Sequence, residues 1–134
     1  MSRDHRKLRV FHDAHALVLH IYKQTQGFPR EEWYGIRQQI RRAAVSVPTN
    51  IVEGSARLGP KEYCNFLNMA LGSACEVAYL VTLAGELGFV TLPVSGLVNQ
   101  SESVVRQLKR LVAEAEMFAA QSPKPKAQKS PPRR

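Results

Sequence analysis

The chain of 134 residues is 44% apolar and 22% charged, with a formal net charge of +8. This balance is that of a globular domain, which excludes a fibrous or wholly disordered chain, and the length fits one domain with its own core. Cys64 and Cys75 lie roughly 16 Å apart along one predicted helix, too far for a disulfide. We therefore expect a reduced, cytoplasmic protein with both thiols buried, and see no apolar signal segment after Met1.

The positive charge lies at the two ends of the chain. Residues 1–9 hold four basic side chains against one acid, and residues 121–134 hold five with no acid, which leaves 10–120 neutral. We therefore predict a basic N-terminal arm (1–9), a folded domain (10–120) and a disordered tail rich in proline and lysine (121–134). The tail cations expected to attract polyanions are Lys124, Lys126, Lys129, Arg133 and Arg134. The alternative is that the tail only keeps the protein soluble.

Apolar residues at helical spacing predict the first helix over about 11–26. Gly27 and Pro29 end it, because glycine suits the position after a helix and proline cannot continue one. Its apolar face comprises Phe11, Ala14, Val18, Ile21 and Thr25.

The second predicted helix covers about 30–55 and contains a proline. Its apolar period continues straight past Pro48, so we predict one kinked helix and not two separate helices. Ser46, Thr49 and Asn50 lie beside the proline, where short polar side chains can satisfy backbone groups that it leaves unpaired.

The third predicted helix runs from Pro60 to about Gly88 and is bare of charge over most of its length. The face expected in the core carries Tyr63, Phe66, Leu67, Ala70, Ala74, Val77 and Val81. The opposite face carries Asn65, Met69, Gly72, Cys75, Glu76, Tyr79 and Leu83, and Glu76 is the only charge between residues 63 and 85. A helix of this kind is normally buried on both sides, so we predict that the second face is an interface between copies of the chain.

A membrane span is the rival interpretation of this helix, because 23 residues with a single charge are long enough to cross a bilayer. Two asparagines, Glu76 and two glycines lower its hydrophobicity, and we therefore expect no membrane association. The fourth predicted helix covers about 93–120, with a stripe of valine and leucine and a charged opposite face. Four amphipathic helices with short connections predict an all-α, up-down-up-down antiparallel four-helix bundle.

Motifs for catalysis are missing from the sequence. It has no Walker loop, GxGxxG, HExxH, GxSxG or CxxC pattern. His12 and His15 are spaced to share one helix face, but a third ligand and a supporting carboxylate are not evident, so we interpret them as surface histidines. We therefore expect neither enzymatic activity nor a metal or other cofactor.

The second predicted helix carries the one concentration of positive charge inside the folded domain. Residues 30–61 hold six basic and three acidic side chains, whereas 62–120 hold three basic and six acidic ones. We predict that nucleic-acid phosphates contact Arg30, Arg37 and Arg41 on one flank, Arg42 pointing outward, and Arg57 and Lys61 in the following connection. The alternative is that these cations pair with Glu53, Glu62, Glu76 or acids of a neighbouring subunit.

Four stretches of the sequence resemble a known family. They are Phe28-Pro29-x-x-Glu32-x-Tyr34-Gly35, Gln39-Ile40-Arg41-Arg42-Ala43-Ala44-Val45-Ser46-Val47-Pro48-x-Asn50-Ile51-Val52-Glu53-Gly54, Glu62-Tyr63-x-x-Phe66-Leu67-x-x-Ala70-Leu71-Gly72-Ser73 and Leu87-Gly88-Phe89. Over roughly residues 8–120 the chain resembles the four-helix-bundle proteins encoded in intervening sequences of bacterial 23S ribosomal RNA genes. A related branch is the accessory variability determinant of diversity-generating retroelements.

The resemblance implies a homopentameric barrel of four-helix bundles without catalytic activity. For the retroelement branch it implies binding to RNA and to a reverse transcriptase. Cys75 replaces the small or acidic residue of the family pattern, and the basic tail is not part of that pattern. The leading hypothesis is therefore an oligomeric RNA-binding accessory protein, and the alternative is a protein-binding scaffold with no direct role in nucleic-acid binding.

Overall fold

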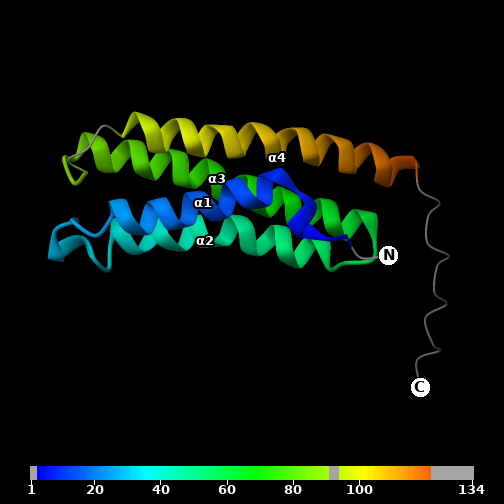
Figure 1. The fold of residues 1–134 in the computed structure, drawn as a ribbon, viewed down its shortest axis with the longest axis horizontal. Coiled ribbons are helices and arrows are strands. Elements are labelled where there is room, and N and C mark those ends of the chain that lie inside the picture. The colour runs from blue at the N-terminus through cyan, green and yellow to red at the C-terminus, as the bar shows by residue number, and fades with distance from the viewer. Residues whose placement is uncertain (1–2, 91–93, 122–134) are drawn as a thin grey trace, which may run out of the picture.

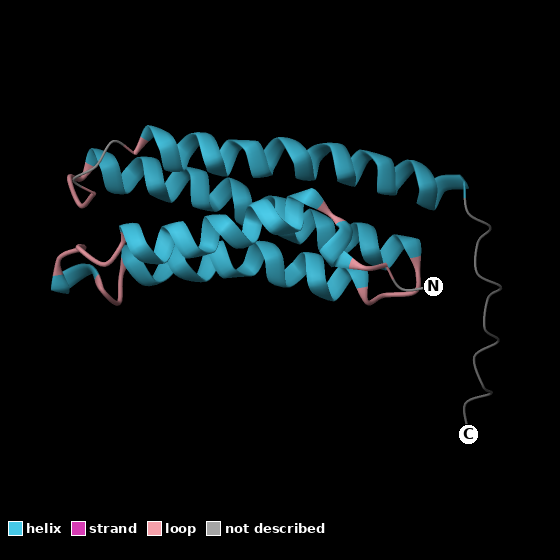
Figure 2. Cartoon of the chain, viewed as in Figure 1, coloured by secondary structure: helices cyan, strands magenta, loops and turns pink. Residues whose placement is uncertain are grey.

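The computed structural model describes residues 3–90 and 94–121, and these residues form helices without any strand (Figures 1 and 2). The four long helices are α1 (Arg9–Gln24), α2 (Ile36–Ser55), α3 (Pro60–Glu86) and α4 (Ser95–Gln121). Two short 3-10 helices, η1 (His5–Lys7) and η2 (Arg30–Glu32), precede α1 and α2. The predicted all-helical fold with four helices is confirmed. Lys124, Lys126, Lys129, Arg133 and Arg134 lie outside the described residues.

The helices lie side by side along one long axis (Figure 1). In Figure 1 the chain runs from right to left along α1 and α3 and from left to right along α2 and α4. Both α1 and α3 pack beside α2 and α4, whereas within the described residues no Cα atom of α1 lies within 8 Å of one in α3. Because α1 and α3 are diagonal neighbours, their outward faces lie on opposite sides of the molecule.

The core forms where apolar residues recur every three or four positions on each helix. On α1 the buried side chains are Val10, Ala14, Leu17 and Ile21, and Thr25 is buried just after the helix. Phe11 and Val18 were predicted on this face, but both are only half-buried because they flank the line that faces the other helices. On α3 every predicted core residue except the half-buried Phe66 is buried.

The start of α2 differs from the prediction. Residues 30–32 form a separate 3-10 helix, and α2 begins only at Ile36. Gly35 interrupts the two with φ −103° and ψ −117°, which is not helical. The Glu32 carboxylate then accepts a hydrogen bond from the Ile36 backbone N–H at 3.3 Å, so an acid from the preceding turn satisfies a free donor at the helix start.

The helix α2 continues through Pro48, as the periodicity predicts. The Asn50 amide donates to the Ser46 carbonyl and hydroxyl at 2.8 and 2.9 Å, and the Thr49 hydroxyl donates to the Val45 carbonyl at 2.7 Å. Pro48 lacks the N–H that would donate to the Ala44 carbonyl. The polar side chains bond the next two carbonyls, those of Val45 and Ser46, and not that of Ala44. The Ser46 hydroxyl also lies 2.8 Å from that of Ser73, which links α2 to α3.

The described part of the predicted N-terminal arm packs on the bundle. The Arg3 backbone N–H donates to the Ser55 carbonyl at 2.8 Å, and the Arg3 guanidinium carbon lies 4.0 Å from the centre of the Tyr63 ring. His12 of α1 lies 2.7 Å from the Arg6 carbonyl through Nε2. These contacts hold residues 3–8 against the ends of α2 and α3.

A close approach of α2 and α3 requires glycine at position 54. A Cβ added there would lie 2.7 Å from the Phe66 Cβ, closer than real atoms come. We expect Gly54→Ala to lower the free energy of unfolding by about 1–3 kcal/mol, because the two helices must move apart. Urea unfolding at a fixed protein concentration measures this, with Gly96→Ala as the control because its new Cβ meets nothing within 4 Å. Equal stability of Gly54→Ala and the wild type would refute the close packing.

Candidate nucleic-acid interface

The face of α3 that points away from the bundle is exposed. The predicted interface residues Asn65, Met69, Gly72, Cys75, Glu76 and Tyr79 are exposed, and Leu83 is half-buried. Met69 and Tyr79 are 55% and 65% exposed, which is unusual for large apolar side chains. A Cβ added at Gly72 would meet nothing within 4 Å, so packing inside this chain does not require glycine there. We name these seven residues the α3 face.

The helix α3 also has the length and composition of a membrane-crossing helix. Its most apolar window has a mean hydropathy of 1.4, and 33% of that window is buried in the structure. A single such helix is weak evidence, since core helices of soluble proteins have the same character. The nine buried residues of α3 pack into the same core as the other three helices.

The two cysteines differ in environment, contrary to the expectation that both are buried. Cys64 is buried, whereas Cys75 is exposed because it lies on the α3 face, which no other helix covers. Burial raises the pKa of the Cys64 thiol, and Glu116 acts in the same direction. Because less thiolate is then present at a given pH, we expect Cys64 to resist alkylation at pH 8 while the protein is folded. Mass spectrometry of peptides after iodoacetamide treatment tests this, and rapid modification of Cys64 in the native protein would contradict it.

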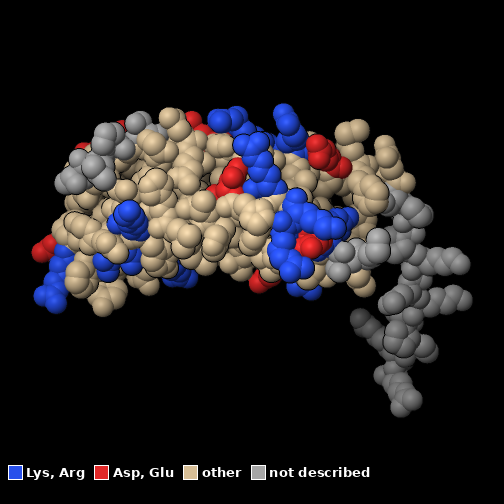
Figure 3. Space-filling view, in the orientation of Figure 1, with Lys and Arg blue, Asp and Glu red and all other residues tan. Residues whose placement is uncertain are grey.

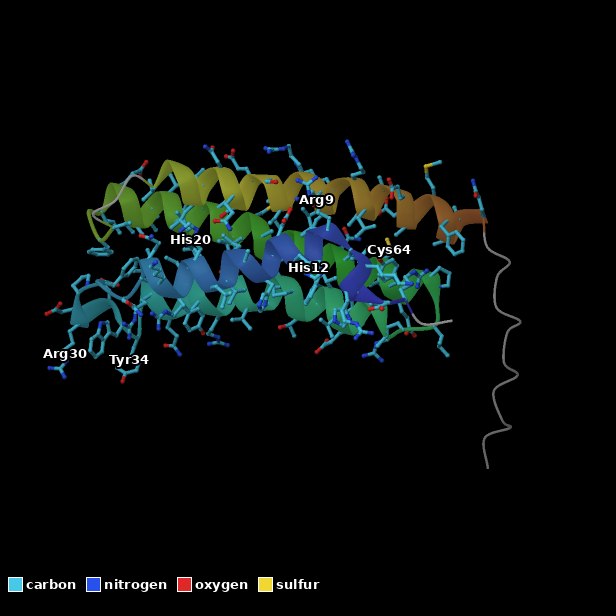
Figure 4. The ribbon with its side chains drawn as sticks, viewed as in Figure 1. Arg9, His12, His20, Arg30, Tyr34 and Cys64 are labelled. Carbon is cyan, nitrogen blue, oxygen red and sulfur yellow. The ribbon has the colours of Figure 1, made fainter. Side chains whose placement is uncertain are left out.

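Two of the predicted arginines meet at one tryptophan. Figure 4 shows Arg30 and Tyr34 of this region at one end of the bundle. The guanidinium carbons of Arg30 and Arg37 lie 5.4 and 4.6 Å from the centre of the Trp33 ring. The Trp33 indole N–H donates to the Phe28 carbonyl at 3.2 Å, which fixes the ring between η2 and α2. Tyr34 follows directly and is 87% exposed. We name Arg30, Trp33, Tyr34 and Arg37 the tryptophan cluster.

The cations of the tryptophan cluster have no acidic partner in the part of the chain that the structure describes. The ion pairs found there join Arg6 to Asp4 and Arg9 to Asp13. Trp33 is half-buried, whereas Tyr34 beside it is exposed. Accessible aromatic rings near guanidinium groups suit nucleic acids, because bases stack on rings while guanidinium groups bind phosphates.

Arg41 is occupied by contacts that spacing along one helix did not predict. Its guanidinium donates to the Thr25 hydroxyl at 2.9 Å and to the Tyr22 carbonyl at 3.2 Å, and its carbon lies 4.5 Å from the Tyr22 ring centre. Burial lowers the pKa of Arg41, and Arg37 adds to the effect. Arg41 therefore binds the end of α1 to α2 and offers less to a ligand than Arg30 and Arg37 do.

The remaining predicted cations are spread over the molecule. Arg42 is exposed and lines a shallow groove between α2 and α3 that also contains Tyr34, Gln38 and Glu76. Arg57 lies at the far end of α2, with its guanidinium carbon 4.9 Å from the Phe66 ring centre, and exposed Lys61 follows at the start of α3. Because α2 has 20 residues, about 30 Å separate Arg57 and Lys61 from the tryptophan cluster.

The centres of the His12 and His15 rings lie 5.3 and 6.2 Å from the centre of the Phe11 ring, and both histidines are exposed. Within residues 3–90 and 94–121, no three His, Cys, Asp or Glu side chains are grouped so that they could hold a metal ion. Among those residues, the structure therefore provides no metal centre next to the tryptophan cluster.

Comparisons with known proteins agree with the resemblance seen in the sequence. No curated protein matches the chain. A solved structure described as a protein with unknown function from the S23 ribosomal protein family of Bacteroides thetaiotaomicron matches with a TM-score of 0.71. It is 22% identical and covers 78% of this chain and 95% of its own, which shows a common fold. The family described as 23S rRNA-intervening sequence protein matches residues 6–110, and the chain therefore belongs to that family.

Proposed function

We propose that this protein is a non-catalytic, homo-oligomeric nucleic-acid-binding protein that prefers RNA and acts in the cytoplasm as an accessory factor. The observation that carries the proposal is the tryptophan cluster, in which two arginines lie over an indole beside an exposed tyrosine and have no acidic partner among the described residues. Arginine binds phosphate oxygens with two parallel hydrogen bonds, and aromatic rings stack on unpaired bases. Single-stranded or looped RNA presents both groups together.

The proposed assembly is a ring, most simply a pentamer, of antiparallel four-helix bundles. Exposure of Met69 and Tyr79 on the α3 face supports an interface there, because a second chain would remove this apolar surface from water. The ring and its five subunits come from the resemblance to the family. A ring repeats the tryptophan cluster in every subunit, so weak contacts add through multivalency.

The proposed partners are RNA, further copies of the chain and, by resemblance to the retroelement branch, a reverse transcriptase. A membrane is not among them, because the nine buried residues of α3 belong to the core of the bundle. The α3 face also favours a second candidate function, an oligomeric scaffold that binds other proteins and has no contact with nucleic acid.

Fluorescence anisotropy of a labelled single-stranded RNA at several salt concentrations tests the proposed function. We expect the logarithm of the affinity of the full chain to fall linearly with the logarithm of the salt concentration, by about 0.7 for each phosphate bound. If the intact oligomer does not bind RNA at low salt, the oligomeric protein-binding scaffold remains as the function.

A further inference from the structure

A second basic surface lies between the start of α1 and the middle of α4. Arg9 of α1 and Ser103, Arg106, Gln107 and Arg110 of α4 line a groove of about 440 Å³ there. In Figure 3, Lys and Arg side chains gather over this part of the molecule. We name Arg9, Arg106 and Arg110 the groove arginines. The sequence pattern placed Arg106 and Arg110 of α4 only on the solvent-exposed face of a helix.

Arg106 and Arg110 are unusual among the arginines of the described chain, because neither has a partner. In residues 3–90 and 94–121, all other arginines except Arg42 contact an aromatic ring or an acid. Four positions separate Arg106 from Arg110, so the two side chains lie one turn apart on the same helix face. Both are exposed, and all their N–H donors are available to a ligand in the groove.

The third groove arginine is only weakly held. The Arg9 Nε atom lies 3.5 Å from a carboxylate oxygen of Asp13, and the Arg9 side chain is 87% exposed, so water weakens this pair. The same Asp13 oxygen accepts a hydrogen bond from the Gln107 amide at 2.8 Å. This bond ties α1 to α4 next to the groove. The other Arg9 donors remain free for a ligand.

The other charges at the groove leave it positive. Among the described residues, Glu114 lines the groove and Asp13 lies beside it, against three guanidinium groups. The start of α1 adds a smaller contribution of positive sign, because Leu8 caps the helix without a side-chain acceptor and its first turn contains no acid. An anion therefore gains more from the three arginines than it loses to Glu114 and Asp13.

The groove lies away from both surfaces described above. It opens beside α1, which is diagonal to α3, so it is separate from the α3 face. Figure 4 places Arg9 well along the bundle from Arg30 and Tyr34 of the tryptophan cluster. Each chain thus carries two separate basic surfaces.

We propose that the groove arginines form a second phosphate-binding site, which holds the backbone of the bound nucleic acid while the tryptophan cluster holds its bases. The identification of the ligand as RNA rests on the proposed function. A free polyphosphate offers the same phosphate groups as RNA, and the experiments below distinguish these two ligands.

The test compares the full chain with Arg106→Gln/Arg110→Gln. The charge-matched control is Lys23→Gln/Lys109→Gln, which removes two exposed cations outside the groove lining. We expect the groove variant to bind single-stranded RNA about tenfold more weakly than the control, with a salt slope smaller by about 0.7 for each phosphate that it no longer binds. Equal circular dichroism and native mass confirm that the variants fold and assemble. RNA affinity and salt slope equal to those of the control would overturn the proposal.

Calorimetric titration with inorganic pyrophosphate separates failure of the groove from failure of the proposed function. If the wild type binds pyrophosphate but no RNA, and the groove variant binds neither, the groove is a phosphate site and the proposed function is wrong. If the wild type and the groove variant bind RNA with equal affinity, the proposed function stands and the groove has no part in it.

Discussion

Gly72→Glu is expected to dissociate the protein into single chains. The new side chain lies on the α3 face, where a carboxylate would be buried without a partner on assembly, at a cost of several kcal/mol per interface. Folding of the single chain should survive, because a Cβ at position 72 meets nothing within 4 Å and glutamate favours a helix more than glycine does. Native mass spectrometry measures the subunit number, and circular dichroism measures the helix content.

Gly96→Glu is the matched control, because position 96 of α4 is also exposed and also offers open space. We expect it to assemble like the wild type. Alkylation of Cys75 provides a second readout, since the α3 face should be protected in the wild type and accessible in Gly72→Glu. A wild type that is monomeric at micromolar concentration, or a Gly72→Glu variant that keeps the wild-type mass, would exclude this face as the interface.

Arg30→Gln/Arg37→Gln is expected to lower RNA affinity by about tenfold or more. Each charge-assisted hydrogen bond contributes roughly 1.5–3 kcal/mol, and about 1.4 kcal/mol corresponds to a factor of ten. The salt slope should fall by about 0.7 for each phosphate that the variant no longer binds. Stability should change little, because the ring of Trp33 is the contact that both guanidinium groups make among the described residues, and Arg37 also repels Arg41.

Arg57→Gln/Lys61→Gln is the control for this variant, since it removes the same charge from the other end of α2. The structure separates these two cations from the tryptophan cluster, so we expect a clearly smaller decrease in affinity. Equal decreases in the two variants would indicate a general electrostatic effect and not a site at Trp33.

Much of the fold could be predicted from the sequence, because apolar spacing and proline positions are local signals. The four helices and the continuation of α2 past Pro48 followed from them. The exposure of the α3 face was also foreseen, since one helix cannot bury two opposite sides in a four-helix bundle. The break between η2 and α2 was missed, because the sequence predicts one helix over about 30–55. Gly35 is compatible with a helix, and only its backbone angles show the break.

The candidate site was predicted less completely, because contacts between helices are invisible to spacing along one helix. The positions of Arg37 and Arg41 differ by four residues, yet Arg37 meets Trp33 and Arg41 meets Tyr22 and Thr25 of another segment. The groove arginines were missed for the same reason, since Arg9 and Arg106 lie far apart in the sequence and meet only through the packing of α1 on α4.

Trp33 fluorescence during titration with RNA tests the central claim most directly. The chain has one tryptophan, and the guanidinium groups of the two arginines proposed to bind RNA both lie over its ring. We predict that a single-stranded RNA quenches its emission and that the change saturates at the RNA concentration given by anisotropy, because stacked bases and displaced guanidinium groups both alter the indole environment. If anisotropy shows that the RNA binds while the Trp33 emission stays constant, the claim is contradicted and the nucleic acid binds elsewhere on the protein.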